Sequence, residues 1–370
     1  MPNHSEYPIS RLKGDRIQNN EAIITDMKNG LITSIGLREM LENEGLTKLS
    51  KSDQNEINIK NALRRIELCK QHRRKKLNLS HLHLAELPEE LLTLHWLEKI
   101  DLSSNKLKRL PDWIGDLKNL TVLDLEANLL ISLPDTIGNL KSLKKINVSF
   151  NQLKTLPETF GNLASLESFN LMEETNHPKL EKMWGRQTAW FAEFPESFCN
   201  LRSLKYFIID NTKIINLPGN FDNLSSLKSL CIWSDTTNYA DSFFPGTMKN
   251  LKSLRYIDIT CFDRVPGFIS EMKKLTVLDL SHNKFYTLPD FIGNLTNLRE
   301  LNLHSTWITE LPEWIANLKN LADLDISNNN ITKKPAVIKK LPKLKTYNDG
   351  SNPFNMNLNR RTKIKQTRSD

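Results

Sequence analysis

Apolar residues recur along this chain in one fixed order that is repeated about every 23 residues. The clearest copies are residues 97–119, 120–142 and 275–297, and each follows the pattern LxxLxLxxNxLxxLPxxIGNLxx. About twelve copies can be aligned on their first leucine, with starts near residues 74, 97, 120, 143, 166, 204, 227, 254, 275, 298, 321 and 344. A fixed period of this length predicts a solenoid, in which each repeat stacks on the next one.

Each repeat opens with a segment that alternates apolar and polar residues at the period of a β-strand. Leu123 and Leu125 are expected to point into the core and Asp124 outward, because successive side chains of a strand face opposite sides. One strand per repeat predicts a parallel sheet on the concave side. The asparagine that follows, such as Asn128, lies where the chain turns away. Its amide is expected to satisfy backbone groups of neighbouring turns.

A leucine–proline pair ends the strand pattern in most repeats, as at Leu133 and Pro134. Proline cannot donate a backbone hydrogen bond to a sheet, so the pair predicts a 3-10, short-helical or irregular return along the convex side. Ile137 and Leu140, and their equivalents in other repeats, are expected to fill the core from that side. The fold class expected from these patterns is an α/β solenoid with the shape of a horseshoe.

The two ends of such an array need caps, because the outermost repeats would otherwise expose core leucines. Residues 56–73 predict an N-terminal cap helix with Ile59, Leu63, Ile66 and Cys69 on one face. The solenoid is then expected over residues 74–355. Residues 1–55 form a polar extension with one possible helix at 34–46, and residues 356–370 form a basic tail. Both are expected to be largely solvated.

Composition and cysteine usage bound the setting of the protein. The formal net charge is +8, which is compatible with a partner that has an acidic surface. The four cysteines lie far apart and form no CxxC pair, so a reducing, cytoplasmic compartment is expected. The first residues contain no apolar leader, and no stretch is apolar enough to span a membrane. An alternative is translocation into a host cell without a Sec signal.

The repeated LPxxIGNL segment resembles the leucine-rich repeat superfamily, in the intracellular 23-residue form of bacterial proteins and plant Ras-group-related proteins. The resemblance covers about residues 60–355. Residues 62–94 are also similar to the entry into bacterial arrays that precede a Roc GTPase. No GxxxxGK[ST] loop is present, so the resemblance implies no GTPase here. Bacterial effectors with such arrays often add a ubiquitin-ligase domain, for which these residues leave no room.

Repeats 5 to 8 depart from the pattern in length. Repeat 5 spans residues 166–203 and contains an insertion, residues 172–193, that includes Trp184, Trp190 and Phe191. Insertions in a repeat form loops on one face, which is often the binding face. Two alternatives remain open: the insertion is a tolerated surface loop, or its aromatic residues fold against the solenoid.

The outward strand positions change in the same repeats. Most repeats have Asp or Asn at the middle outward position, as a polar column that is best explained structurally, but repeats 6 and 7 have Ile208 and Cys231. Exposed apolar surface of this kind tends to mark a binding site, and Trp and Tyr are favoured anchors. The surrounding outward positions hold four further apolar or aromatic residues: Met172, Tyr206, Trp233 and Tyr256. The long insertion could instead cover this surface.

A basic edge is expected beside these residues, because Lys205, Lys228 and Arg255 occupy one outward position in consecutive repeats, with Arg299 two repeats on. An apolar centre with a charged rim is the usual anatomy of an interface. A row of solvated charges explains the same residues equally well.

Catalytic and metal chemistry find little support in the sequence. Cys231 is separated from His304 by three strands, or about 14 Å at the usual strand spacing, so the two cannot form a nucleophilic pair. No Cys/His cluster offers four zinc ligands, and no cofactor is expected. Acidic residues on the concave face disfavour nucleic acid.

The resulting hypothesis is a non-catalytic scaffold that binds a protein on the concave face of repeats 5 to 8. The alternative is a bacterial effector or adaptor that recruits host signalling or ubiquitination machinery.

Overall fold

The computed structural model describes residues 51–173, 191–210, 214–233 and 239–355. The possible helix at 34–46, the tail at 356–370 and the two tryptophans Trp184 and Trp190 lie outside the described residues. The chain divides into two compact units, residues 1–57 and residues 58–370, and the second contains all of the sheet.

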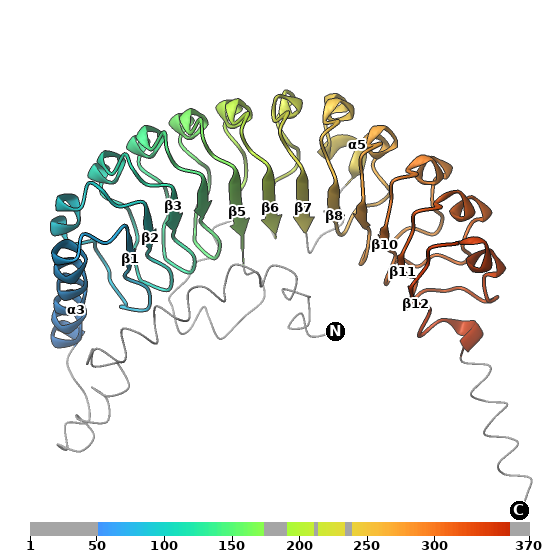
Figure 1. The fold of residues 1–370 in the computed structure, drawn as a ribbon, viewed down its shortest axis with the longest axis horizontal. Helices are drawn as coiled ribbons and strands as arrows, with labels where there is room; N and C mark the ends of the chain where they lie inside the picture. The colour runs from blue at the N-terminus through green and yellow to red at the C-terminus, as the bar shows by residue number, and fades with distance from the viewer. Residues whose placement is uncertain (1–50, 174–190, 211–213, 234–238, 356–370) are drawn as a thin grey trace, which may run out of the picture. The chain divides into compact units, whose positions relative to one another are not determined.

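Twelve parallel strands form one sheet in the described part of the second unit, and each strand pairs with its neighbours in sequence. The strands line the inner side of an arc and the 3-10 helices its outer side (Figure 1), which confirms the predicted solenoid. The strands are β1 (Lys76–Asn78), β2 (Lys99–Asp101), β3 (Val122–Asp124), β4 (Lys145–Asn147), β5 (Ser168–Met172), β6 (Tyr206–Asp210), β7 (Ser229–Trp233), β8 (Tyr256–Ile259), β9 (Val277–Asp279), β10 (Glu300–Asn302), β11 (Asp323–Asp325) and β12 (Thr346–Asn348).

Short 3-10 helices follow the leucine–proline pairs, as the sequence predicts. In all but η9, a proline with φ between −73° and −61° directly precedes the helix, because the ring fixes the backbone angle needed there. The helices are η4 (Glu89–Thr93), η5 (Asp112–Asp116), η6 (Asp135–Asn139), η7 (Glu158–Asn162), η8 (Glu196–Asn200), η9 (Phe221–Asn223), η10 (Gly246–Asn250), η11 (Gly267–Glu271), η12 (Asp290–Asn294), η13 (Glu313–Asn317) and η14 (Ala336–Lys340). One short α-helix, α5 (Ala240–Phe243), lies between β7 and η10.

The glycine of the IGNL segment lets these helices stack closely. A Cβ atom at Gly115 would clash with the backbone carbonyl of Thr136 in the next repeat, and Gly138 meets Thr159 in the same way. Any larger residue would therefore push η5 and η6 apart. The preceding isoleucines, Ile114 and Ile137, are fully buried as predicted.

Buried asparagines connect neighbouring turns through their side-chain amides, which confirms the predicted role. Asn105 is fully buried, and its Oδ1 accepts hydrogen bonds from the backbone N–H groups of Leu82 (3.2 Å) and Leu84 (3.0 Å). Its Nδ2 donates to the backbone carbonyls of Leu79 and Leu102, each at 2.9 Å. The same bonds recur at Asn128, Asn283 and Asn329.

The cap helix α3 spans Lys51–Gln71, whereas residues 56–73 were expected to form it. Ala62, Ile66 and Cys69 are buried in one hydrophobic cluster with Leu77 of the first strand. The expectation for Ile59 was wrong: its side chain is 36% exposed, because Ala62 and Ile66 define a stripe one residue away from it around the helix.

Phenylalanine rings fill the core beneath repeats 4 to 6. Asn151 of repeat 4 still makes the interturn bonds, whereas the described residues of repeats 5 and 6 contain no asparagine in that role. Phe207 on β6 lies within ring-contact distance of four others, with centroids 5.4–5.9 Å away. Seven rings take part in this cluster: Phe160, Phe169, Phe191, Phe194, Phe198, Phe207 and Phe221. Phe191 from the predicted binding loop is therefore a core residue, fully buried against Phe194.

Candidate functional site

The strands β5, β6 and β7 are longer than the regular ones, and at β6 and β7 the residue at the middle outward position explains the added length. In a regular strand, Oδ1 of Asp101 accepts a hydrogen bond from the backbone N–H of Ser103 (2.9 Å), and Ser104 then turns with a left-handed φ of 56°. Such a side-chain turn ends the strand after three residues. Ile208 and Cys231 have no amide or carboxylate oxygen to close that turn. Consequently β6 and β7 continue for two more residues.

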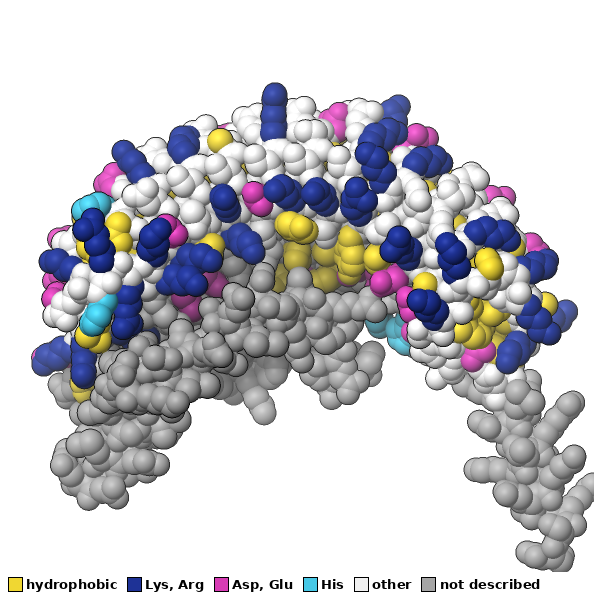
Figure 2. Space-filling model, in the orientation of Figure 1, with side chains coloured by type: hydrophobic (Ala, Val, Ile, Leu, Met, Phe, Trp, Pro, Cys, Tyr) yellow, Lys and Arg dark blue, Asp and Glu magenta, His cyan; other side chains and the backbone are white. Residues whose placement is uncertain are grey.

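The two extra residues enlarge the outward face of the sheet at its centre. The register places Ile208 beside Cys231, and Tyr206 and Tyr256 on either side of Ser229. We call the five residues Tyr206, Ile208, Cys231, Trp233 and Tyr256 the concave patch. Figure 2 shows hydrophobic side chains gathered at this part of the sheet, with Lys and Arg side chains in a row above them. The sequence thus predicted correctly which residues lie together.

The exposure expected for two members of the concave patch was wrong. Ile208 and Cys231 are only 8% and 6% exposed, so they form a floor and offer little free surface. Tyr206 is 47% exposed, and Trp233 and Tyr256 are half-buried. Tyr206 precedes Ile208 by two residues on β6, and Trp233 follows Cys231 by two residues on β7, so the rings lie in the rows on either side of the two smaller side chains. The accessible part of the concave patch is therefore aromatic and amphipathic.

Met172 lies at the margin of the concave patch, because the register pairs it with Asp210, which in turn pairs with Trp233. Lys205, Lys228 and Arg255 border the opposite side: the backbone N–H of Lys228 donates to the carbonyl of Lys205, and that of Arg255 to the carbonyl of Lys228 (both 2.9 Å). The predicted basic edge is thus a continuous row across three adjacent strands.

A buried carboxyl group lies beside the concave patch, on β8. Asp258 is 8% exposed and pairs in register with Cys231. Its Oδ2 accepts a hydrogen bond from the hydroxyl of Tyr256 (3.4 Å). Its carboxyl group also accepts a hydrogen bond from the indole of Trp233. Burial, helped by the neighbouring Asp279, raises the pKa of Asp258 from 3.8 to about 8. The sequence pattern placed Asp258 in the polar column with nine others. Only its aromatic hydrogen-bond partners, Tyr256 on the same strand and Trp233 on β7, set it apart.

The raised pKa predicts a pH-dependent stability. Folded Asp258 holds a proton between pH 3.8 and about 8 that the unfolded chain releases, so its contribution is complete below pH 3.8 and is lost as pH rises through about 8. The free energy of unfolding of the wild type should fall relative to Asp258→Asn across this range, by at most about 1.4 kcal/mol per pH unit. Urea unfolding of both proteins at pH 5, 7 and 9 measures the difference.

A second buried carboxyl group offers a parallel test of the same pH dependence. Burial raises the pKa of Glu173 to about 8 as well, and its Oε1 accepts a hydrogen bond from the backbone N–H of Phe191 (2.7 Å). Glu173→Gln should remove a similar part of the pH dependence. If the difference between wild type and Asp258→Asn is the same at all three pH values, the assignment of Asp258 is wrong.

The described residues that could carry covalent or metal chemistry are held in other roles. Burial raises the pKa of the Cys231 thiol, so little thiolate forms at neutral pH, and the pKa of Cys199 is raised to about 12. All four cysteines are free thiols. His282 and His304 contact one another (ring centroids 5.1 Å apart), and Nδ1 of His304 is 2.8 Å from Oγ of Ser327. Within the described ranges, no three Asp, Glu, His or Cys residues group in a way that could hold a metal ion.

Comparison with known families finds one match, described as "Leucine-rich repeat region", over residues 53–184 and 269–348, which is more than half of the chain. No curated protein matches the sequence. Among the described residues, no helix combines the length and apolarity that crossing a membrane requires.

Several solved structures share the architecture. An internalin of Listeria monocytogenes is 19% identical, with a TM-score of 0.55, and the match covers 75% of this chain and 82% of the internalin. The TLR13 chain of a TLR13–ssRNA13 complex is 23% identical, with a TM-score of 0.61, covering 79% of this chain and 45% of that one. A chain of the mouse RP105/MD-1 complex is 20% identical, with a TM-score of 0.58, covering 75% and 46%. At these identities, the likeness concerns the fold alone.

Proposed function

Because the chain belongs to the leucine-rich repeat family, we propose that it is a non-catalytic scaffold that binds a protein partner on the concave face of repeats 5 to 8. Leucine-rich repeat folds generally serve protein–protein interaction. The observation that carries the proposal is the concave patch, where the chain replaces the polar column by aromatic and apolar residues and lengthens two strands.

The chemistry of the concave patch resembles that of a binding hot spot. Trp233 and Tyr256 combine large apolar rings with polar atoms that already donate to Asp258, and Tyr206 offers an accessible ring. Lys228 and Arg255 form a charged rim at one side. An apolar centre with such a rim favours an acidic or mixed protein surface over a small molecule.

Replacement of Trp233 by alanine should weaken binding of the partner by about 2 kcal/mol or more, roughly thirtyfold in Kd. The ring would no longer bury its face against the partner. The partner is first captured with the wild-type protein and identified, and its purified form is then titrated against both proteins by calorimetry. Tyr206→Ala, which leaves the bonds to Asp258 intact, should also weaken binding.

The matched control is Trp307→Ala, because Trp307 is an exposed tryptophan outside the concave patch. It should leave the affinity unchanged, and circular dichroism should show the same melting temperature for Tyr206→Ala and the wild type. An unchanged affinity of both Trp233→Ala and Tyr206→Ala would refute the assignment of this surface.

The cellular setting is a separate proposal. Four free cysteines, three of them buried, support a reducing compartment such as the cytoplasm. The role of an effector or adaptor that acts in a host cell stays a prediction. Fractionation of host cells exposed to the producing organism would test it.

A further inference from the structure

One row of residues runs along the whole sheet, at the position just before each strand. The backbone N–H of every member after Lys75 donates to the carbonyl of the member one repeat earlier, with donor–acceptor distances of 2.7–2.9 Å, so the row is continuous. We call it the edge row. Its members are Lys75, Glu98, Thr121, Lys144, Glu167, Lys205, Lys228, Arg255, Thr276, Arg299, Ala322 and Lys345.

The first half of the edge row contains two acidic members, and each forms an ion pair with a basic member. Lys75 pairs with Glu98 at 2.6 Å, and Glu167 pairs with Lys205 at 3.0 Å. The hydrogen bond and charge of Lys205, with a smaller effect of Lys144, lower the pKa of Glu167. Acidic and basic members thus alternate up to β6.

The second half of the edge row contains only cations and neutral residues. From β7 onward the members are Lys228, Arg255, Thr276, Arg299, Ala322 and Lys345. Among the residues that the structure describes, no carboxylate lies within 4.0 Å of the charged groups of Lys228, Arg255, Arg299 or Lys345. Lys228 and Arg255 precede consecutive strands, whereas Arg299 and Lys345 each follow one neutral member. Charges of one sign along the row repel one another, and a bound anion would relieve that repulsion.

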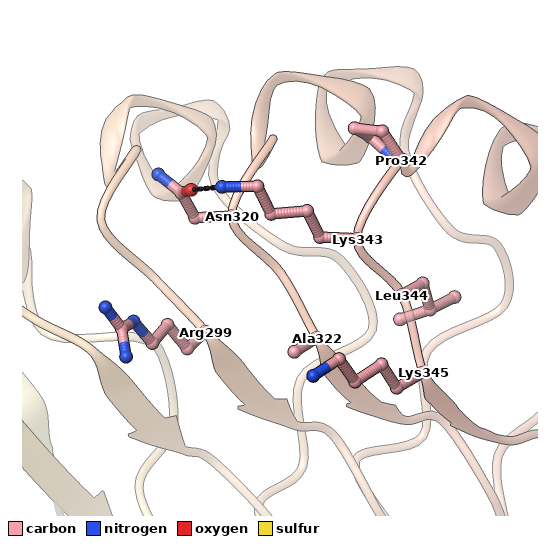
Figure 3. A pocket seen from close by; sticks show the side chains of 7 residues that line it. All are labelled: Arg299, Asn320, Ala322, Pro342, Lys343, Leu344 and Lys345. Atoms are coloured by element: carbon pink, nitrogen blue, oxygen red, sulfur yellow. Dashed lines mark hydrogen bonds between the residues drawn. The ribbon is translucent and has the colours of Figure 1, made fainter.

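A hollow of about 480 Å³ lies at the far end of this half. Ala322 has only a methyl side chain, and it lines the hollow together with Arg299 and Lys345. The side chain of Lys345 extends toward Ala322, and that of Arg299 points away from it (Figure 3). Lys343 lies on the same side, and its Nζ donates to Oδ1 of Asn320 at 2.7 Å, an acceptor that is neutral. Three cationic side chains therefore line the hollow.

Carboxylates in the next row limit where an anion can lie. Glu300 and Asp323 are paired in register on β10 and β11, one residue further along each strand than Arg299 and Ala322. An anion that moved toward the centre of the sheet would meet them. An anion is therefore favoured at the outer side of the edge row, away from these carboxylates.

We propose that the edge row from β7 to β12 binds an extended acidic segment of the partner polypeptide, with one carboxylate in the hollow beside Arg299 and Lys345. The inference rests on the proposed function, since it specifies the chemistry of that partner. Five strand spacings of about 4.8 Å span about 24 Å, the length of about seven extended residues. A polypeptide can alternate acidic and apolar side chains, and so place the latter on the concave patch.

The test uses fluorescein-labelled deca-glutamate as the probe, with fluorescence anisotropy as the readout. The wild type should bind this peptide with an affinity that falls as salt is added, because the contacts are ionic. Arg299→Glu/Lys345→Glu should bind it about tenfold more weakly at low salt. The matched control is Lys333→Glu/Lys334→Glu, which changes the net charge equally at two exposed lysines outside the edge row. It should change the affinity less than about twofold, since those lysines are screened from the peptide.

Three results would overturn the inference: no binding of deca-glutamate to the wild type, an equal loss in both double variants, or tighter binding of single-stranded oligothymidine or phosphatidylserine vesicles than of deca-glutamate. Titration of the purified partner against Trp233→Ala separates this inference from the proposed function. If Trp233→Ala weakens binding of the partner while deca-glutamate fails to bind, the proposed function of the concave patch is supported and the proposed acidic segment is refuted.

Discussion

Replacement of Phe207 by alanine is expected to lower the free energy of unfolding by about 3–5 kcal/mol. The side chain is fully buried on β6, and its ring contacts four other phenylalanines, with the closest centroids 5.4 Å away at Phe198. Alanine would leave a cavity that the stiff neighbouring rings cannot fill, so both burial and ring contacts are lost. Urea unfolding followed by circular dichroism measures the change.

The control for this prediction is Tyr286→Ala, which removes an aromatic ring that is 61% exposed. Its effect should stay within about 0.5 kcal/mol. A loss of less than about 1 kcal/mol for Phe207→Ala would contradict the tight ring cluster, since a well-packed interior cannot absorb so large a cavity.

Replacement of Asn105 by alanine should be nearly as damaging, with a loss of about 2–4 kcal/mol. The side chain makes five hydrogen bonds to backbone groups. Alanine would leave the N–H groups of Leu82 and Leu84 and the carbonyls of Leu79 and Leu102 without them. These groups are buried, so water cannot replace the amide without opening the turn. The same unfolding measurement applies, with hydrogen exchange of the Leu84 amide as a local readout.

Two further variants serve as comparisons for Asn105→Ala. Asn119→Ala removes one exposed hydrogen bond, from Nδ2 to the carbonyl of His95, and should cost less than about 1 kcal/mol. Asn105→Thr copies repeat 10, where Oγ1 of Thr306 donates to the carbonyl of Leu303, and should lie between the two. Equal stabilities of Asn105→Ala and Asn119→Ala would show that the buried amide is not a structural link.

The repeat pattern predicted the architecture well because each rule acts within about one repeat. Leu123 is buried and Asp124 faces outward because of the strand period alone, and Pro134 begins a 3-10 helix because its ring fixes φ. The amide of Asn128 finds its partners at fixed distances in the chain, 21 and 26 residues away. Such local geometry can be read from spacing.

The sequence predicted which residues form the concave patch, but it did not predict how deeply their side chains are buried. Counting from the first leucine of each repeat places Ile208 beside Cys231 without any coordinates, and the register agrees. How far these side chains sink depends on the rings of Tyr206 and Trp233 on either side, which spacing does not describe. The environment of Asp258 is similar: its residue type matches the polar column, whereas its burial arises from neighbours in another repeat.

The cap helix shows the same limit. The periodicity around Ile59 fits two adjacent stripes of the helix, and only the docking angle against Leu77 decides between them. That docking angle depends on the residues of the first repeat, so it cannot be predicted from the sequence of the helix alone.

Every strand of the sheet bonds only to its neighbours in sequence, and this connectivity has a kinetic consequence. Closing each new contact requires a loop of about one repeat, whatever the length of the array, so folding can start at any strong pair of repeats and spread outward. The phenylalanine-rich repeats around Phe207 are the natural nucleus, because they bury the most aromatic surface per repeat. Unfolding should then proceed from both ends toward them, so that a partly opened molecule retains its concave patch longest.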